Sequence, residues 1–202
     1  MAGLMTKILL QKSDQQQKKI YQKLFLKSQH SLKSLHCFSK ENQTLRFKTL
    51  ALIGNLEGCK ILDIGCGFGD FFLYLANQKI YFQGIGYDII KEFVTIAQQQ
   101  NPSHNFFCEN ILKNPPDEKF DFVFSSGIYA FGNQTFFREM TKLAFLLSRK
   151  GYAFNIHESQ GKKFLKLDRK EAYQFCETLS PKKIEIIEEE KLPNDYTVFL
   201  YR

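Results

Sequence analysis

Apolar residues recur at helical spacing in the first part of the chain. Pairs of apolar side chains four residues apart predict a helix over residues 13–29; they are Ile20 with Leu24 and Tyr21 with Phe25. Ser13 followed three residues later by Gln16 is typical of the start of a helix. A second helix is expected over residues 41–56, ending at Gly58, with an apolar face made of Leu45, Thr49, Leu52, Ile53 and Leu56.

From Cys59 onward, short apolar segments alternate with helical ones. Strands are predicted over residues 60–65, 82–89, 104–112, 119–127 and 152–157. Helices are predicted over residues 70–78, 91–102, 134–151 and 168–180, the second stopped by Pro102 and the third by Gly151. The tail, residues 182–202, reads as two strands joined at Pro193, Asn194 and Asp195.

This alternation predicts an α/β fold, because strands separated by helices form a parallel sheet with helices on both faces. We expect a doubly wound, mostly parallel seven-stranded sheet whose last strand is antiparallel. Residues 1–58 are expected to form a basic helical cap, and residues 59–202 a Rossmann-like domain. A chain of 202 residues is long enough to bury one such core.

Composition adds three expectations. No run approaches the ~20 apolar residues that span a bilayer, so neither a membrane segment nor a signal peptide is expected. The five cysteines are scattered without a CxxC pair, which favours reduced thiols in the cytoplasm and no metal site. Residues 1–60 hold 11 Lys and Arg against 3 Asp and Glu, whereas residues 61–202 hold 17 against 18. The basic excess therefore lies in the N-terminal segment.

The segment ILDIGCGFGD, residues 61–70, carries the clearest chemistry. Gly65, Gly67 and Gly69 leave bare backbone after a strand, which lets a ligand approach closely. The spacing is GxGxG rather than the GxGxxG of dinucleotide-binding turns. Asp63 and Asp70 flank the glycines and would repel a pyrophosphate by about 4 kcal/mol per charge pair at ~4 Å. A ligand that carries a positive charge fits this turn better.

The same segment resembles the first motif of class I S-adenosylmethionine-dependent methyltransferases, which combines an acid between hydrophobic residues with GxGxG. The resemblance covers about residues 43–202 and implies this fold, S-adenosylmethionine as the cofactor and S-adenosylhomocysteine as the product. It implies that the cofactor contacts the turn through Asp63, Gly65, Cys66, Gly67, Gly69 and Asp70. Asp88, with Ile89 beside it, would accept hydrogen bonds from the two ribose hydroxyls.

Later landmarks of the family fall in order along the chain. The segment CENIL places Glu109, Asn110 and Ile111 where the family contacts adenine, although the family usually has an acid at the position of Asn110. Ser125 and Ser126 follow the next strand, beside the methyl donor. Upstream, Arg46 resembles a residue that clamps the methionine carboxylate in some bacterial members.

Simpler interpretations remain open for some of these residues. Asp88 also fits a helix cap, Arg46 a solvated helix charge, and Glu109 and Asn110 plain turn residues. No catalytic residue is assigned, because methyl transfer from a sulfonium depends mainly on positioning. Tyr129 and His157 are the candidates, Tyr129 because it would line the acceptor pocket and His157 because it ends a strand on the ligand side.

The leading hypothesis is a methyltransferase that acts on a small-molecule acceptor, with no membrane partner. Two alternatives stay open. One is a nucleic-acid methyltransferase whose basic N-terminal segment contacts phosphates. The other is a protein that binds the cofactor without catalysis.

Overall fold

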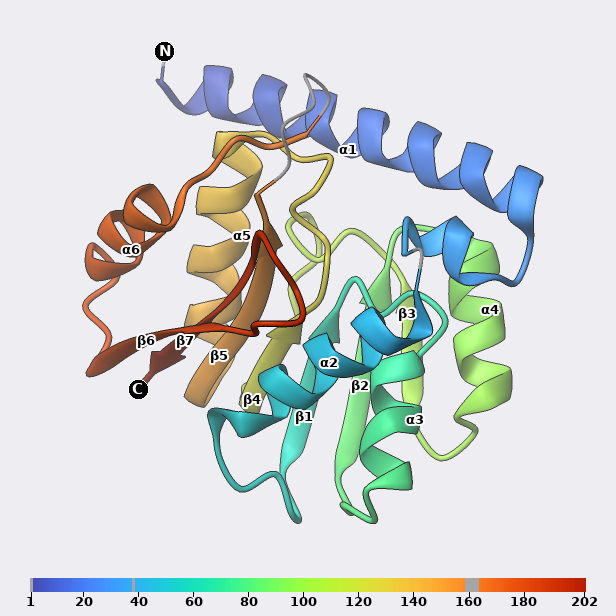
Figure 1. Cartoon of the computed structure of the whole chain (residues 1–202). Coiled ribbons are helices and arrows are strands. Elements are labelled where there is room, and N and C mark those ends of the chain that lie inside the picture. The colour runs from blue at the N-terminus through green and yellow to red at the C-terminus, as the bar shows by residue number, and fades with distance from the viewer. Residues whose placement is uncertain (1, 38, 159–163) are drawn as a thin grey trace.

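A seven-stranded sheet forms the centre of the computed structural model across the residues that it describes, 2–37, 39–158 and 164–202 (Figure 1). The strand order is β3-β2-β1-β4-β5-β7-β6. The strands are β1 (Lys60–Ile64), β2 (Gln83–Asp88), β3 (Asn105–Cys108), β4 (Phe120–Ser125), β5 (Ser148–His157), β6 (Lys183–Glu188) and β7 (Asp195–Tyr201). Strands β1 to β5 pair in parallel, and β7 runs antiparallel to both β5 and β6. The predicted doubly wound sheet is confirmed.

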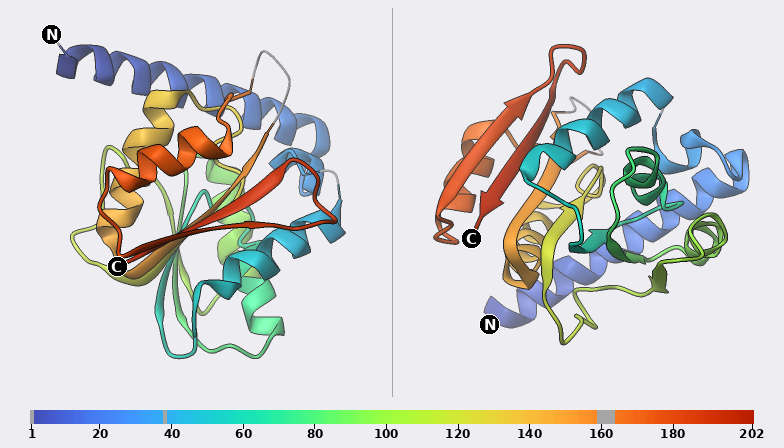
Figure 2. Two further views of the ribbon diagram at one scale, coloured as in Figure 1. Left: turned by 60° about the vertical axis from the view of Figure 1, so that its left-hand side comes forward. Right: turned by 90° about the horizontal axis from the view of Figure 1, so that it is seen from below.

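Helices cover both faces of the sheet (Figure 2). Helices α2 (Lys40–Leu50), α3 (Asp70–Asn77) and α4 (Lys91–Gln100) share one apolar core, and α5 (Gln134–Leu147) and α6 (Arg169–Glu177) share the other. Successive strand residues point to opposite faces, so Ile61 packs in the first core and Leu62 in the second. Strands buried on both faces explain the nearly continuous apolar runs in the sequence.

The long first helix lies across the carboxyl ends of the parallel strands (Figure 1). Helix α1 spans Ala2–Ser28 and therefore begins well before the predicted start. The capping prediction at Ser13 is wrong: this residue is buried in mid-helix, and its hydroxyl accepts a hydrogen bond from Gln17 Nε2 at 3.1 Å. Leu10, one turn earlier, packs against the second core, which accounts for the longer helix.

The segment between α1 and β1 contains two short 3₁₀ turns, η1 (Leu32–Leu35) and η2 (Ala51–Ile53), on either side of α2. Helix α2 is shorter than expected, and its predicted apolar face is partly wrong. Leu52 is 61% exposed, whereas Gln43, Phe47 and Leu50 are buried. The change from helix to 3₁₀ turn after Leu50 alters the spacing, so Leu52 leaves the predicted face, whereas Ile53 and Leu56 stay buried.

The predicted stop of α5 at Gly151 is also wrong, because the helix ends at Leu147 and β5 begins at Ser148. The Ser148 hydroxyl donates to the Phe145 carbonyl at 2.8 Å and closes the helix end. Gly151 serves close packing instead: a Cβ there would lie 2.9 Å from Ile53 Cδ1 and 3.0 Å from the Leu200 carbonyl oxygen.

The chain leaves β1 toward β2 and β3 on one side, and β4 lies on the other side of β1. The crevice beyond the ends of β1 and β4 is therefore the point at which the strand order reverses, where open α/β sheets bind ligands. None of the helices in the described part of the chain combines the length and the apolar character needed to cross a bilayer.

Candidate functional site

The glycine turn after β1 requires residues without side chains. Gly65, Gly67 and Gly69 have φ angles of 75°, 54° and 78°, a region that L-residues rarely adopt. A Cβ at Gly65 would lie 2.1 Å from Ile128 Cγ2. The backbone N–H of Gly65 donates to the Tyr87 carbonyl at 2.7 Å, which fixes the turn against β2. The result is a rigid floor of bare backbone at the end of the sheet.

Gly69 has a packing role beside the turn. It precedes α3 and faces helix α4, where a Cβ would come within 2.5 Å of Asn101 Nδ2. Asn101 Nδ2 also donates to the Gly69 carbonyl at 3.3 Å. Gly69 therefore allows α3 and α4 to pack closely, and it does not line the cavity described below.

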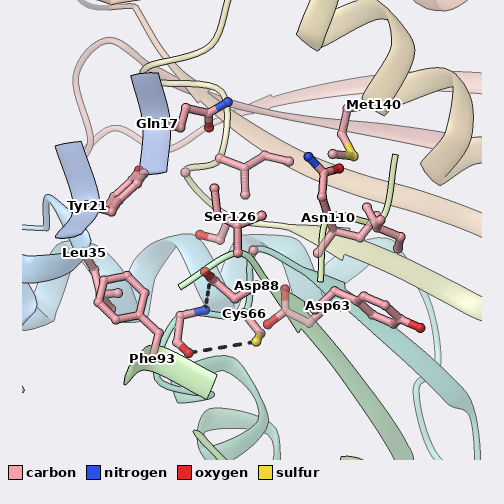
Figure 3. Close-up of a pocket in the computed structure, with 18 of the residues that line it drawn as sticks. Gln17, Tyr21, Leu35, Asp63, Cys66, Asp88, Phe93, Asn110, Ser126 and Met140 are labelled. Atoms are coloured by element: carbon pink, nitrogen blue, oxygen red, sulfur yellow. Dashed lines mark hydrogen bonds between the residues drawn. The ribbon is translucent and has the colours of Figure 1, made fainter. Parts of the chain in front are cut away.

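Asp88 organises the turn from the end of β2. Its Oδ2 accepts the Gly67 N–H at 3.0 Å (Figure 3). Its Oδ1 accepts the Ile90 N–H at 2.9 Å. Burial raises the Asp88 pKa to about 6, although backbone donors such as the Ile90 and Gly67 N–H groups lower it. A carboxylate has about four lone-pair directions, so Asp88 keeps acceptor capacity for a ligand.

Asp63, the acid inside β1, is buried and faces the same cavity (Figure 3). Burial, and then the negative charges of Asp88 and Asp70, raise the pKa of Asp63 to about 8. A buried carboxylic acid with like-charged neighbours favours a cationic ligand, since that ligand stabilises the ionised form.

Asp70, the first residue of α3, is held by the helical cap. Gln43 Nε2 donates to Asp70 Oδ2 at 3.1 Å, and Lys40 Nζ donates to Gln43 Oε1 at 2.9 Å. Gln43 is buried and lines the cavity together with Asp70. Helix α2 therefore closes one side of the site.

Helix α1 forms the roof of the cavity. Tyr21 packs its ring edge against Phe93 of α4 and against Phe131, with ring centroids 6.2 and 5.6 Å apart. Asp14 pairs with Lys113 Nζ at 2.6 Å across the cavity rim. Burial, and then the charge of Asp88, raise the pKa of Tyr21, so its hydroxyl stays neutral.

The cavity has a volume of about 600 Å³, within the range of pockets for cofactors and drug-sized ligands. Twelve of the fourteen cofactor-binding residues predicted from the sequence line it: Arg46, Asp63, Gly65, Cys66, Gly67, Asp70, Asp88, Ile89, Glu109, Asn110, Ile111 and Ser126. Gly69 and Ser125 do not. The cavity thus brings together the glycine turn, the acids and the residues after β3 that are expected near adenine. They come from β1, β2, the loop after β3 and the loop after β4.

Two predicted contacts meet competing partners in the structure. Asn110 Oδ1 already accepts the Leu112 N–H at 3.0 Å, so a contact to adenine would use its remaining lone pair or its amide group. The Ser125 hydroxyl is fully buried and accepts a hydrogen bond from the Tyr152 hydroxyl at 3.1 Å. The backbone after β4 reaches the cavity at Ser126 instead.

Tyr129 turns its hydroxyl into the protein core. The hydroxyl lies 2.9 Å from Thr141 Oγ1 and 2.7 Å from the Tyr152 hydroxyl, and burial raises its pKa. These partners occupy the Tyr129 hydroxyl, so we do not assign it a chemical role, although the Tyr129 side chain lines the second cavity described next.

A second cavity of about 480 Å³ adjoins the first. Both cavities are lined by Tyr21, Leu35, Cys37, Arg46 and Gly127, so they meet beside the loop after β4. The second cavity also contains His157, at the end of β5. His157 Nδ1 lies 2.5 Å from Asp195 Oδ1, and Arg46 Nε donates to Asp195 Oδ2 at 2.6 Å.

These contacts bear on two predicted residues. The pKa of Asp195 is lowered: burial acts to raise it, but the hydrogen bonds from His157 and Arg46 outweigh burial. Arg46 lines both cavities while it holds Asp195, so its predicted role as a clamp for the methionine carboxylate stays a prediction.

The sequence interpretation missed two features of the site. The roof residues Gln17 and Tyr21 and their neighbours on α1 have no motif, and only tertiary packing brings them over the glycine turn. Asp195 was assigned to the turn between the last strands. In the antiparallel pairing of β5 with β7, His157 lies opposite Asp195. A prediction of this strand register would have placed the two residues side by side.

Comparisons with known proteins agree with this geometry. A family model described as a methyltransferase domain matches residues 61–151. Release factor glutamine methyltransferase from Buchnera aphidicola is 30% identical over 93 residues, which are 44% of this chain and 34% of that protein. Demethylmenaquinone methyltransferase from Bacillus licheniformis is 29% identical over 120 residues, which are 57% of this chain and 51% of that protein. The chain thus spans about a third and about a half of the length of these curated relatives.

Among solved structures, magnesium protoporphyrin IX methyltransferase from Synechocystis with bound S-adenosylhomocysteine superposes with a TM-score of 0.65. The match covers 80% of this chain and 83% of that one, at 16% identity. At this identity the superposition shows that the fold is shared.

Proposed function

We propose that this chain, which belongs to the class I S-adenosylmethionine-dependent methyltransferases, transfers a methyl group from S-adenosylmethionine to a small-molecule acceptor. The observation that carries the proposal is a cavity with a floor of bare glycine backbone and, next to that floor, the acids Asp63, Asp70 and Asp88. A cationic nucleoside without phosphate fits this combination, because the acids attract its charge and would repel a pyrophosphate.

The residues present fit this cofactor. Gly65 and Gly67 keep space for close backbone approach that a Cβ would fill. When bound, S-adenosylmethionine supplies a methyl group on a sulfonium, which is a good leaving group. The residues of the chain bind the cofactor, orient it and shield it from water. Asp88 offers acceptors to vicinal hydroxyls, and α1 covers the cavity and restricts the access of water.

The acceptor side supports a small molecule. The second cavity of about 480 Å³ has the size of a pocket for a small organic compound, and it meets the first at Arg46 and Gly127. Two of the relatives above are named for small acceptors, demethylmenaquinone and magnesium protoporphyrin IX. The basic excess of residues 1–60 is compatible with another partner, but α1, which carries part of it, also forms the roof of the cavity.

Incubation of the full chain with methyl-labelled S-adenosylmethionine tests the proposal. Label is expected in products from the small-molecule fraction of a cell extract and not in total RNA added separately. Label in RNA alone would favour the nucleic-acid alternative. Binding of S-adenosylhomocysteine without label in any fraction would favour a non-catalytic protein.

Asp88→Ala is expected to weaken binding of S-adenosylhomocysteine by about 1.5–3 kcal/mol, the contribution of hydrogen bonds to a charged group. Asp88→Asn should weaken it less, since its side-chain oxygen still accepts the Gly67 N–H. Calorimetric titration measures both, with Asp117→Ala, outside the cavity, as the control. An unchanged dissociation constant in Asp88→Ala would place the ribose elsewhere.

A further inference from the structure

We propose, resting on the function above, that His157 is the general base of the reaction and that the acceptor in the second cavity carries a phenolic or enolic hydroxyl group. The proposal starts from an Asp–His pair at the ends of two neighbouring strands. His157 ends β5 and Asp195 begins β7, and the antiparallel register places them directly opposite each other.

The Asp195 carboxylate sets the protonation pattern of the imidazole. Its Oδ1 lies 2.5 Å from His157 Nδ1, so in the neutral ring Nδ1 carries the hydrogen and donates it. Nε2 then holds a free lone pair and is the basic atom of the ring. If Nε2 takes a proton, the adjacent carboxylate stabilises the resulting imidazolium.

Arg46 keeps Asp195 ionised and in place. Its Nε donates to Oδ2 at 2.6 Å, the oxygen that His157 does not contact. The Asp195 side chain is only 6% exposed, whereas that of His157 is 46% exposed. The carboxylate is therefore fixed behind the imidazole, and the imidazole faces the second cavity. Arg46 and Asp195 are positioning residues in this arrangement.

The surroundings of His157 suit an aromatic or otherwise planar hydroxyl compound. His36 and Phe164 line the second cavity, with ring centroids 5.5 Å apart, and His36 also packs on Phe131 at 4.9 Å. Besides His157, the charged and titratable side chains that line the second cavity are Arg46, His36, Glu158, Tyr21, Cys37 and Tyr129. Burial, and then the electrostatic effects of His157 and Arg46, lower the pKa of His36.

In the proposed step, the acceptor oxygen attacks the methyl carbon while its O–H proton passes to His157 Nε2. A carbon–oxygen bond forms, the carbon–sulfur bond breaks, and the electron pair of that bond remains on sulfur, whose positive charge disappears. The products are the methyl ether, the neutral thioether and an imidazolium that later releases its proton to water. A phenol or enol needs this proton removal to become a strong nucleophile, which is why the base indicates this acceptor class.

The test uses the full chain, methyl-labelled S-adenosylmethionine and three hydroxyl probes: 1-naphthol, catechol and 4-hydroxycoumarin. 1-Naphthylamine serves as the amine of matched shape. We expect labelled ethers from at least one hydroxyl probe and no labelled amine. His157→Ala should lower kcat by about 10²- to 10⁴-fold, the usual contribution of a general base, and leave binding of S-adenosylhomocysteine unchanged.

Three further readouts separate a base from a structural residue. The acid limb of the pH–kcat profile should be present in the wild type and absent in His157→Ala. Added imidazole should partly restore the activity of His157→Ala. Asp195→Asn should lower kcat more than it changes KM, and His30→Ala, whose side chain is exposed and outside both cavities, should behave as the wild type.

Three results would overturn the inference: wild-type kcat in His157→Ala, methyl transfer to 1-naphthylamine, or methyl transfer to none of the hydroxyl probes. Calorimetry with S-adenosylhomocysteine distinguishes this failure from failure of the proposed function. A chain that binds S-adenosylhomocysteine and labels another compound keeps the proposed function and loses only the base and its acceptor class.

Discussion

Asp63→Asn is expected to stabilise the ligand-free protein at pH 8 and, at the same time, to weaken its binding of S-adenosylmethionine. The pKa of Asp63 is raised from 3.8 to about 8 by burial and by its acidic neighbours. Between these values the unfolded chain has lost the proton that the folded chain keeps, so the stability of the folded state falls as pH rises through this window. Removing the acid should recover on the order of 2–5 kcal/mol at pH 8.

Binding of a cationic ligand reverses the preference of Asp63 for its protonated form. A cationic ligand stabilises the Asp63 carboxylate, so binding should release up to one proton near pH 7 and tighten as pH rises from 6 to 8. Asp63→Asn cannot ionise and should show neither the proton release nor this tightening. Calorimetry in two buffers of different ionisation enthalpy measures the proton release, and chemical denaturation at pH 5 and pH 8 measures stability.

The control for Asp63→Asn is Glu57→Gln, an exposed acid far from the cavity, which should leave both measurements unchanged. Tighter binding of S-adenosylmethionine by Asp63→Asn would contradict the electrostatic account of the site. Equal stability of wild type and variant at pH 8 would show that Asp63 ionises freely in the ligand-free protein.

Gly67→Val is expected to abolish binding of S-adenosylhomocysteine, with a loss of affinity greater than about 100-fold, or more than about 2.7 kcal/mol. Gly67 has φ of 54°, and a Cβ there would lie 2.9 Å from Leu35 Cδ2, above the floor of the cavity. The two methyl groups of Val extend further into the space that the ligand needs.

Gly58→Val provides the matched control for backbone strain. Gly58 has φ of 69°, but nothing lies within 4 Å of a Cβ at that position, and it does not line the cavity. Both variants should lose stability, by about 1–2 kcal/mol for an L-residue forced into this region. Only Gly67→Val should lose the ligand; calorimetric affinity near that of the wild type in this variant would remove the glycine turn from the site.

The order of strands and helices follows from local patterns. Strand β1 and helix α3 lie within one residue of their predicted bounds, because an apolar run, a glycine turn and an amphipathic segment succeed one another without ambiguity. Errors occur where tertiary packing decides. Gly151 has the composition of a helix stop, yet its role is close contact between β5, η2 and β7.

The candidate site shows the same division. The turn at Gly65 and Gly67 and the acids at Asp63 and Asp88 could be predicted because they lie at or near the carboxyl ends of β1 and β2, and neighbouring parallel strands end on the same side of a sheet. The roof could not be predicted, since nothing in the sequence of α1 indicates which surface it covers. Ser125 is fully buried and Ser126 lines the cavity, although they are adjacent and chemically identical. The alternation of side chains at a strand end separates them.

The most direct test of the charge preference of the crevice is a pair of titrations on the same preparation of the full chain, one with S-adenosylhomocysteine and one with NADH. The acids around the glycine turn predict saturable one-site binding of S-adenosylhomocysteine and no measurable heat from NADH, whose pyrophosphate they repel. Saturable binding of NADH, with S-adenosylhomocysteine unable to displace it, would contradict the account.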